Sequence, residues 1–560
     1  MRTLMYTFIR FCLVGILFTG ATPLASAQGP VKVATEKGLT QETGARLQQI
    51  LNDFVSNPEH PYVGGLSAAI KIDGLAFWQG AAGLAARDVD AQNNPLSTGT
   101  PFTVNTPSQI YSVTKTFTAT LVLELVQQGV LNLNDPVKKY LPFLATINPG
   151  MNLDVTIHQL LAHESGYSDF WLNPYLQGYV AMNRGKSIDP LVALSFVGMD
   201  FEPGTIRTYS STNYIVLGVI VEAITKQTIE EHFRQRFFQP LQLNSMFLRG
   251  REEPVGPYEV AAPHDNIYGF NQIFVPTGQP TFPNTITNIT AMDFTAVASL
   301  AFTSGGIVSN VADVAEWGSA LYGGRATSKA VLDMMLKSIS STPDEDGDYL
   351  GYGLWKSTKL SDKETFIGHD GNSIGYRSVM FYQPEKKLTI AVLINDGGAD
   401  RYAVAKALYT ALVKDVYCGN DNRQEPKVQL CNKGKVQCVA QSAAQVLIEK
   451  GANIGVCAPA TVQLAPEVVP ETDGVAPLRI YPNPVTSSAV LSFGTEQSGP
   501  VSLRLYDING RLVTTLFEGV VEKGAVQQVV LERASLPAGV YFSRLQTAAG
   551  ITQKKVVLNR

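Results

Sequence analysis

Ser112-Val113-Thr114-Lys115 opens a long apolar run that reaches Gln128. The run is apolar over most of its circumference, which predicts a buried helix. Side chains three residues apart share one face of a helix, so the Ser112 hydroxyl and the Lys115 amine are expected one turn apart. A serine becomes a good nucleophile when a partner takes its proton, and a lysine in a dry cleft can do so because burial lowers its pKa. These residues therefore form a candidate acyl-transfer site.

A second polar cluster, Tyr209-Ser210-Ser211-Thr212-Asn213-Tyr214, precedes an apolar helix expected over residues 212–225. A tyrosine hydroxyl beside cationic groups can have its pKa lowered enough to act as a base. The alternative is a helix cap of small polar residues with a packed tyrosine.

A third cluster, Gly368-His369-Asp370-Gly371-Asn372-Ser373, leads into two strand-like runs. Glycines at a strand edge leave room for a substrate backbone, and free N–H groups there can face a developing oxyanion. The alternative is an ordinary glycine-rich turn into a hairpin.

Other polar residues favour structural roles. The pattern from Thr156 predicts a capped helix ending at Gly166, with His163 near its end, where it would bind carbonyl groups and interact favourably with the helix dipole. His264 in a loop is also expected to be structural. The chain contains no H-E-x-x-H motif, which disfavours zinc hydrolases of that type.

Hydrophobic periodicity predicts an α/β (α+β) fold. A helix is expected over residues 40–57, a hairpin around Asp73-Gly74, two late strands at 378–382 and 388–393, and a closing helix over 403–416. Strands lie at both ends of this region and helices in its middle. This order predicts one antiparallel sheet assembled from distant segments, with helices on both faces and a helical subdomain.

The two ends of the chain differ from this region. Residues 1–27 resemble a secretory signal, with an apolar core and the cleavage pattern Ala25-Ser26-Ala27, and no later apolar run predicts a transmembrane segment in the mature chain. From about residue 477, short alternating runs broken by turn signals predict a small β-sandwich. Length of 560 residues, 16% charged residues and a net charge of −4 fit a multidomain globular protein without a nucleic-acid partner.

Four cysteines crowd into 40 residues ahead of the sandwich: Cys418, Cys431, Cys438 and Cys457. In an exported protein they predict two disulfides, whose three possible connectivities the sequence leaves open. A zinc site is the alternative, but paired C-x-x-C spacing is absent. No metal or cofactor is expected.

The three polar clusters, in this order, resemble the serine β-lactamase and penicillin-binding-protein superfamily. The branch that contains class C β-lactamases, DD-carboxypeptidases, D-aminopeptidases and esterases is most similar. Runs such as Ser304-Gly305-Gly306 and Gly351-Tyr352-Gly353 agree with it, and the resemblance covers about residues 40–416. It implies a helical domain against an α/β sandwich, with the site between them.

The resemblance also implies residue roles. Ser112 would be the acylated nucleophile, Lys115 would assist proton removal, and Tyr209 would be the base and acid across the cleft. Ser211, His369, Gly371 and Asn372 would bind substrate, with the backbone N–H groups of Ser112 and Asn372 forming the oxyanion hole.

Two positions depart from the family pattern. Ser211 replaces the usual Asn of Tyr-x-Asn, and a serine has a shorter reach and one fewer donor. His369 replaces Lys or Arg, and a histidine is a weaker, switchable partner for a substrate carboxylate at neutral pH. Both departures favour a peptidase or esterase over an efficient β-lactamase.

The C-terminal region carries a second resemblance, to the sorting domain of the type IX secretion pathway. The runs that carry it are Tyr481-Pro482-Asn483-Pro484, Leu505-Tyr506-Asp507-Ile508-Asn509-Gly510-Arg511, Leu536-Pro537-Ala538-Gly539-Val540-Tyr541-Phe542 and Lys555-Val556-Val557-Leu558. It implies export through the periplasm, by the type IX secretion machinery, to the outer-membrane surface or the medium of a bacterium.

The predicted organisation is therefore a signal peptide at 1–27, a serine hydrolase domain at 36–416, a cysteine-containing element and linker at 417–476, and a sorting domain at 477–560. The expected activity is hydrolysis through an acyl-serine, on D-Ala-terminated or other D-amino-acid peptides or small esters. A β-lactamase, a catalytically silent penicillin-binding-like protein and a surface adhesin are the alternatives.

Overall fold

The computed structural model describes residues 38–57, 64–91, 95–256, 259–264, 293–344, 346–457, 478–481, 485, 488–495, 497–507, 511–523, 525, 527–532, 536–537, 539–547 and 550–558. The predicted signal segment 1–27 and most of the predicted linker lie outside these residues. Two units are distinguished, residues 1–460 and 461–560, and each is described by itself.

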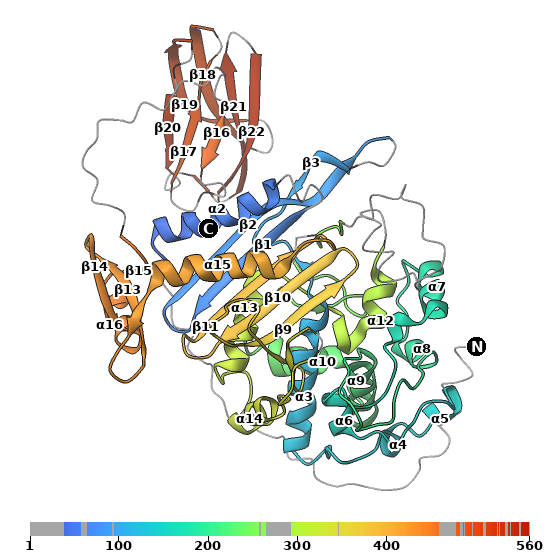
Figure 1. Cartoon of the computed structure of the whole chain (residues 1–560). Helices are drawn as coiled ribbons and strands as arrows, with labels where there is room; N and C mark the ends of the chain where they lie inside the picture. Colours follow the sequence, from blue (N-terminus) through green and yellow to red (C-terminus); the bar gives the residue numbers. More distant parts are fainter. Residues whose placement is uncertain are drawn as a thin grey trace, which may run out of the picture. The chain divides into compact units, whose positions relative to one another are not determined.

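An antiparallel eight-stranded sheet forms the centre of the first unit (Figure 1). Its order is β3-β2-β1-β11-β10-β9-β8-β7, so strands from both ends of the sequence are neighbours, as predicted. The strands are β1(Gly65–Ile72), β2(Ala76–Val89), β3(Pro95–Pro101), β7(Tyr349–Leu350), β8(Trp355–Ser357), β9(Phe366–Ser373), β10(Tyr376–Gln383) and β11(Leu388–Ile394). The β1–β2 hairpin turns at Asp73-Gly74, with Ile72 opposite Ala76.

The sheet is buried on both faces, and alternate residues of its central strands enter different cores. In β11, Ile390 and Val392 pack under α2(Gln41–Ser56) and α15(Arg401–Val416). The intervening Ala391 and Leu393 pack with Trp317 of α13(Val311–Tyr322) on the other face. This two-sided burial explains why the strands are nearly continuous apolar runs.

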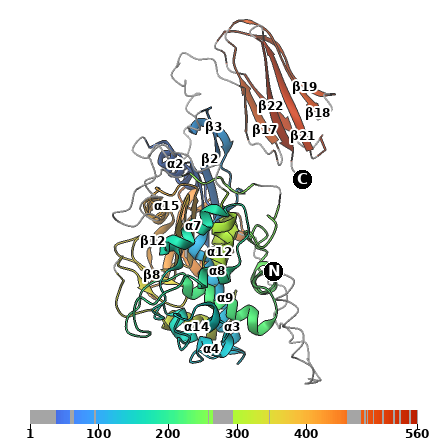
Figure 2. The ribbon, with the colours of Figure 1, turned by 90° about the vertical axis from the view of Figure 1, so that its right-hand side faces the viewer.

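Helices between β3 and β7 form the predicted helical region, which lies beside the sheet (Figure 2). It contains η1(Tyr111–Val113), α3(Thr114–Gln127), α4(Val137–Tyr140), α5(Leu144–Ile147), α6(Ile157–Leu161), η2(Phe170–Leu172), α7(Pro174–Met182), α8(Pro190–Leu194), α9(Thr212–Thr225), α10(Ile229–Phe233), η3(Arg234–Phe238), α12(Thr295–Gly305), α13 and α14(Lys329–Lys337). A small sheet of β4(Ser108–Gln109), β6(Ile307–Ser309) and β5(Phe247–Leu248) joins segments of this region.

The cysteine-containing element packs on the hydrolase-like core. It comprises β12(Tyr417–Asn420), β13(Pro426–Asn432), β14(Lys435–Ala440), α16(Gln441–Glu449) and β15(Asn453–Ile454). Val428, Leu430 and Ile454 are buried in the cluster that also contains Leu47 of α2 and Leu412 of α15. The two predicted disulfides are present, with Cys418 joined to Cys438 and Cys431 to Cys457.

The described residues of the second unit form seven short strands in two antiparallel sheets, as the turn signals predicted. The strands are β16(Arg479–Tyr481), β17(Ser488–Phe493), β18(Gly499–Asp507), β19(Leu512–Val521), β20(Gln527–Glu532), β21(Gly539–Thr547) and β22(Gly550–Leu558). The sheet orders are β16-β17-β20 and β19-β18-β21-β22. Alternate residues Val501, Leu503 and Leu505 of β18 are buried in the core between them.

No helix among the described residues is long and apolar enough to cross a membrane.

Candidate active site

The nucleophile candidate Ser112 lies in η1, two residues before α3 begins. The preceding residue, Tyr111, has φ of 42°, a conformation that non-glycine residues adopt at an energetic cost. Strand β9 packs closely against this turn. A Cβ atom on Gly371 of β9 would lie only 2.3 Å from the Ile110 carbonyl oxygen. Ser378 of β10 also donates to that oxygen, at 2.8 Å. The sheet therefore fixes the turn that carries Ser112.

Lys115 is the second residue of α3, one helical turn after Ser112 as the spacing predicted, and is fully buried. Its Nζ lies 2.9 Å from Ser112 Oγ, 3.4 Å from Ser211 Oγ and 2.8 Å from the carbonyl oxygen of Ser304. Burial lowers the pKa of Lys115 to about 7, although the charges of Asp169 and Asp370 oppose this shift. A neutral amine beside the hydroxyl can accept its proton near neutral pH.

Tyr209 lies across the cleft from α3. Its ring stacks on His163 at a centroid distance of 4.5 Å, and Lys115 Nζ lies 4.8 Å from its ring centre. The buried phenol oxygen has no hydrogen-bond partner of normal geometry, although Ser112 is close enough to favour its ionised form. Burial nevertheless raises the pKa of Tyr209 well above its ordinary value, so the expectation of a lowered pKa is wrong. The phenol is therefore neutral at neutral pH, and in this form it can donate a proton.

Ser211 occupies the N-cap position of α9, where its side chain makes no capping hydrogen bond. Its hydroxyl is the one that Lys115 contacts, and its backbone N–H donates to Asp169 Oδ2 at 2.9 Å. Asp169 was not predicted as a site residue, because it lies in a loop with no motif around it. Ser304, which accepts from Lys115, was noted only as part of a supporting run.

His369 is a buried residue of β9 whose ring packs on Trp355 at 4.5 Å and lies 6.1 Å from the Tyr209 ring. Its Nδ1 lies 2.6 Å from the carbonyl oxygen of Asp370. Burial, reinforced by the charge of Lys115, lowers the pKa of His369 to about 4. His369 is therefore uncharged at neutral pH, and a substrate carboxylate gains no ion pair from it.

Asp370 points toward α15, where it binds Arg401 Nε at 2.6 Å and accepts from the Tyr402 hydroxyl at 2.7 Å. Burial alone would raise the pKa of Asp370, but Arg401, His369 and Tyr402 together lower it. This ion pair, which the sequence did not indicate, ties the third polar cluster to α15.

A cavity of about 300 Å³ opens beside Ser112. Its lining includes Tyr209, Ser211 and Asn372, the last of which is exposed, while Gly371 lies behind it against Ile110. The cavity therefore joins residues from all three polar clusters of the sequence.

The sequence suggested that His163 binds carbonyl groups at the end of a helix. The structure places it elsewhere. Helix α6 ends at Leu161, and His163 follows with φ of 59°. Its Nδ1 accepts the backbone N–H of Ser210 at 3.1 Å, and burial lowers its pKa well below the ordinary value. The neutral imidazole of His163 therefore packs against the Tyr209 ring. No group of three metal-ligating side chains occurs within the described ranges.

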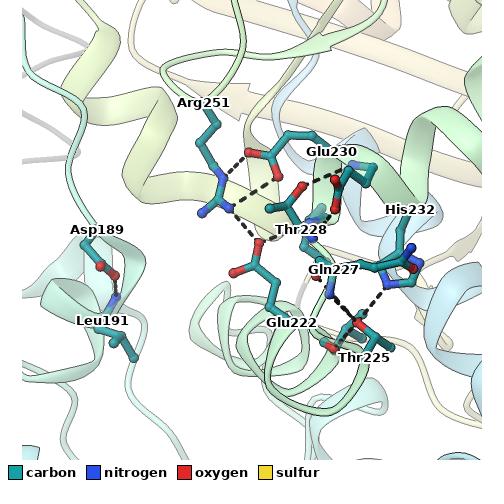
Figure 3. Close-up of polar contacts among 12 residues, drawn as sticks. Asp189, Leu191, Glu222, Thr225, Gln227, Thr228, Glu230, His232 and Arg251 are labelled. Atoms are coloured by element: carbon teal, nitrogen blue, oxygen red, sulfur yellow. Dashed lines mark hydrogen bonds and ion pairs between the residues drawn. The ribbon is translucent and has the colours of Figure 1, made fainter. Parts of the chain in front are cut away.

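Arg251 lies in a polar network with residues of α9 and α10 (Figure 3). Arg251 binds Glu222 of α9 at 2.6 Å and Glu230 of α10, and its guanidinium lies 4.6 Å from the ring centre of Phe302. Phe302 interrupts α12 with φ of 43°, two residues before Ser304. The network holds a strained residue next to the carbonyl that Lys115 binds.

The fold and this site define a class of protein. The family model described as Beta-lactamase matches residues 59–415, more than half of the chain, and the chain therefore belongs to the beta-lactamase family, whose members include serine hydrolases. Penicillin-binding protein 4 of Amycolatopsis lactamdurans is 30% identical over 369 residues, which are 64% of this chain and 86% of that protein.

Solved structures agree with the fold. A D-stereospecific amidohydrolase from Streptomyces sp. matches with a TM-score of 0.51 and 25% sequence identity. The match covers 65% of this chain and 97% of the amidohydrolase chain. The D-amino acid amidase from Ochrobactrum anthropi SV3 in complex with L-phenylalanine has a TM-score of 0.52 and 23% identity, covering 67% and 99%.

The second unit has a match of its own. The model described as Secretion system C-terminal sorting domain matches residues 479–559. Such a type IX sorting domain directs the protein to the cell surface or the extracellular space.

Proposed function

We propose that this protein is a secreted serine hydrolase that acts on D-amino-acid amides or peptides, or on small esters, through an acyl-Ser112 intermediate. The observation that carries the proposal is the position of the buried Lys115 amine, 2.9 Å from the Ser112 hydroxyl. The 25% identity to a D-stereospecific amidohydrolase supports the choice of substrate.

In the first step Ser112 Oγ attacks the substrate carbonyl while neutral Lys115 accepts the hydroxyl proton. The oxyanion is bound by backbone N–H groups of Ser112 and Asn372. Tyr209, which is neutral, donates its proton to the departing amine or alkoxide and regains one from the Lys115 ammonium. Water then attacks the acyl-serine with the same groups acting in reverse, which releases the acid and restores Ser112.

A fluorophosphonate probe tests this proposal. The mature protein is expected to be tagged on the peptide that contains Ser112, as read by mass spectrometry, and Ser112→Ala should abolish the tag. Ser210→Ala is the matched control, because that buried hydroxyl has no hydrogen-bond partner and its loss should leave tagging intact. Tagging of Ser112→Ala at the wild-type rate would overturn the assignment.

A substrate panel then separates the possible activities. D-amino-acid amide, D-Ala-D-Ala peptide, short chromogenic ester and cephalosporin are compared by kcat/KM. A burst of released chromophore with the ester reports acyl-enzyme accumulation, which a catalytically silent binding protein does not show.

A further inference from the structure

The cavity beside Ser112 is strongly acidic. Four aspartates line it, two from one loop, one from another loop and one from β9: Asp344, Asp346, Asp169 and Asp370. Among the described residues that line it, Arg401 alone carries a permanent positive charge. Its guanidinium forms an ion pair with Asp370.

The other three carboxylates form no ion pair with any described residue. Asp169 accepts backbone N–H groups of Trp171 and Ser211, and Asp344 accepts those of Asp346 and Asp348. These hydrogen bonds fix the carboxylates in place without an ion pair to neutralise them, and Asp169 also interacts with the charge of Lys115 when that amine is protonated. The cavity wall therefore carries an excess negative charge close to the nucleophile.

Aromatic rings form much of the remaining wall. Trp171 and Trp355 line the cavity with Tyr111 and Tyr209, and the buried Tyr209 hydroxyl there has no partner. Ring faces attract cations, most strongly when the cation is desolvated. Carboxylates and ring faces in one cavity are the two features that bind an ammonium group.

A carboxylate would find no partner in the same cavity. His369 is neutral at neutral pH, Arg401 already holds Asp370, and Lys115 is enclosed by Ser112, Ser211 and Ser304. An anionic substrate would instead meet three carboxylates that form no ion pair with a described residue, and repulsion between like charges lowers its affinity.

We propose that the substrate presents an ammonium group to Asp169, Asp344 and Asp346, so that the enzyme selects amides or peptides of D-amino acids with a free amine over substrates that end in a carboxylate. This inference rests on the proposed function and names its substrate class. It places D-Ala-D-Ala peptides and penicillins among the poor substrates, because both carry a carboxylate.

A three-member series with one leaving group tests the inference. D-phenylalanine p-nitroanilide carries an ammonium, its N-acetyl derivative is neutral and its N-succinyl derivative is anionic. At low ionic strength kcat/KM should fall in that order, by about tenfold or more between the cation and the anion, and salt should reduce the ratio. Equal rates, or preference for the anion, would overturn the inference.

Variants that remove one negative charge each test which aspartates cause the preference for the cationic substrate. Asp346→Asn and Asp344→Asn should lower kcat/KM for the cationic substrate several-fold and leave the neutral one little changed, since asparagine keeps the shape and an acceptor oxygen. Asp362→Asn, an exposed aspartate paired with Lys406 away from the cavity, is the matched control and should change neither rate. Equal effects on all three substrates would indicate a merely structural role and contradict the inference.

Binding to Ser112→Ala separates this inference from the proposed function. Calorimetry should show D-phenylalanine amide binding more tightly than N-acetyl-D-phenylalanine amide, whether or not Ser112 is the nucleophile. Tighter binding of the cation with tagging of Ser112→Ala at the wild-type rate would overturn the proposed function alone. Wild-type turnover of the neutral substrate with equal binding of the two amides would overturn the inference alone.

Discussion

The Nζ of Lys115 lies 2.9 Å from Oγ of Ser112, and the lysine is fully buried. Because burial disfavours its charge, the pKa of Lys115 falls to about 7. Proton transfer from Ser112 requires the neutral amine. The rate of acylation should therefore rise with pH up to about 7 and level off above it. Stopped-flow acylation by a neutral chromogenic ester across about pH 5 to 9 measures this profile.

Lys115→Arg provides the comparison, because an arginine stays protonated throughout this range. The variant should lose acylation by about 100-fold or more and show no rising limb near pH 7. His369 adds no limb of its own, since its pKa is about 4. A wild-type profile that is flat between pH 6 and 8 would contradict a role for neutral Lys115.

The same ionisation predicts how stability depends on pH. Below about pH 7 Lys115 is protonated in both states, so the full cost of burying its charge destabilises the fold. Between about pH 7 and 10.5 only the unfolded state keeps the proton, so the free energy of unfolding rises with pH. Lys115→Met should gain stability relative to wild type at pH 6, and this difference should shrink by on the order of 3–5 kcal/mol by pH 10.5. Urea unfolding at several pH values measures it.

The loss of hydrogen bonds in Lys115→Met does not obscure this test. The carbonyl of Ser304 loses its donor, which costs about 1–3 kcal/mol at every pH. The readout is therefore how the difference in free energy of unfolding between Lys115→Met and wild type changes with pH. A difference that is constant from pH 6 to 10.5 would show that the lysine is not buried as a charge.

Tyr209→Phe should separate stability from activity. The phenol oxygen is buried without a partner, so its removal should leave the free energy of unfolding unchanged or raise it by about 1 kcal/mol. Acylation should fall by about 100-fold or more, because the proton relay to the leaving group is lost. Urea unfolding and kcat with a D-amino-acid amide measure the two effects. A stable variant with full activity would remove Tyr209 from the mechanism.

Much of the fold could be predicted from local sequence signals. Helix α2 begins after Thr40, whose side chain accepts from Thr43, and the β1–β2 hairpin turns at Asp73-Gly74 as expected. These features depend on capping and turn chemistry, which act within a few residues. Helix α6 ended five residues earlier than predicted, because His163 adopts a left-handed conformation under Tyr209, a tertiary contact with no local signal.

The features of the candidate site also divide into those that local sequence predicts and those that depend on tertiary contacts. The spacing of Ser112 and Lys115 follows from helical geometry and could be predicted. The raised pKa of Tyr209 could not, because it depends on burial among residues that are distant in sequence. The acidic lining was missed for a related reason: Asp169 and Asp344 come from separate loops, and aspartate in a loop is ordinarily a turn residue.

Reduction of the disulfides should weaken the fold but spare the site. Cys418–Cys438 and Cys431–Cys457 close loops with separations of 20 and 26 residues, and each is expected to contribute about 3 kcal/mol. The element they staple packs on α2 and α15, and none of its residues lines the cavity. Reductant should lower the thermal midpoint by several degrees while tagging of Ser112 at 25 °C persists. Loss of tagging from a still-folded reduced protein would contradict this separation.

Gly371→Ala should damage the site through the backbone. Its Cβ would lie 2.3 Å from both the Ile110 carbonyl oxygen and Ser378 Oγ, so β9 must move away from the turn that carries Ser112. We expect a loss of about 1–3 kcal/mol in the free energy of unfolding and a fall in acylation of at least tenfold. Gly178→Ala is the matched control, because Gly178 is exposed within α7 with no atom near its Cβ position. That variant should be stabilised by about 0.5–1 kcal/mol with unchanged acylation, since alanine is the better helix former. Thermal unfolding and the rate of fluorophosphonate tagging measure both variants, and wild-type tagging by Gly371→Ala would show that β9 does not position the nucleophile.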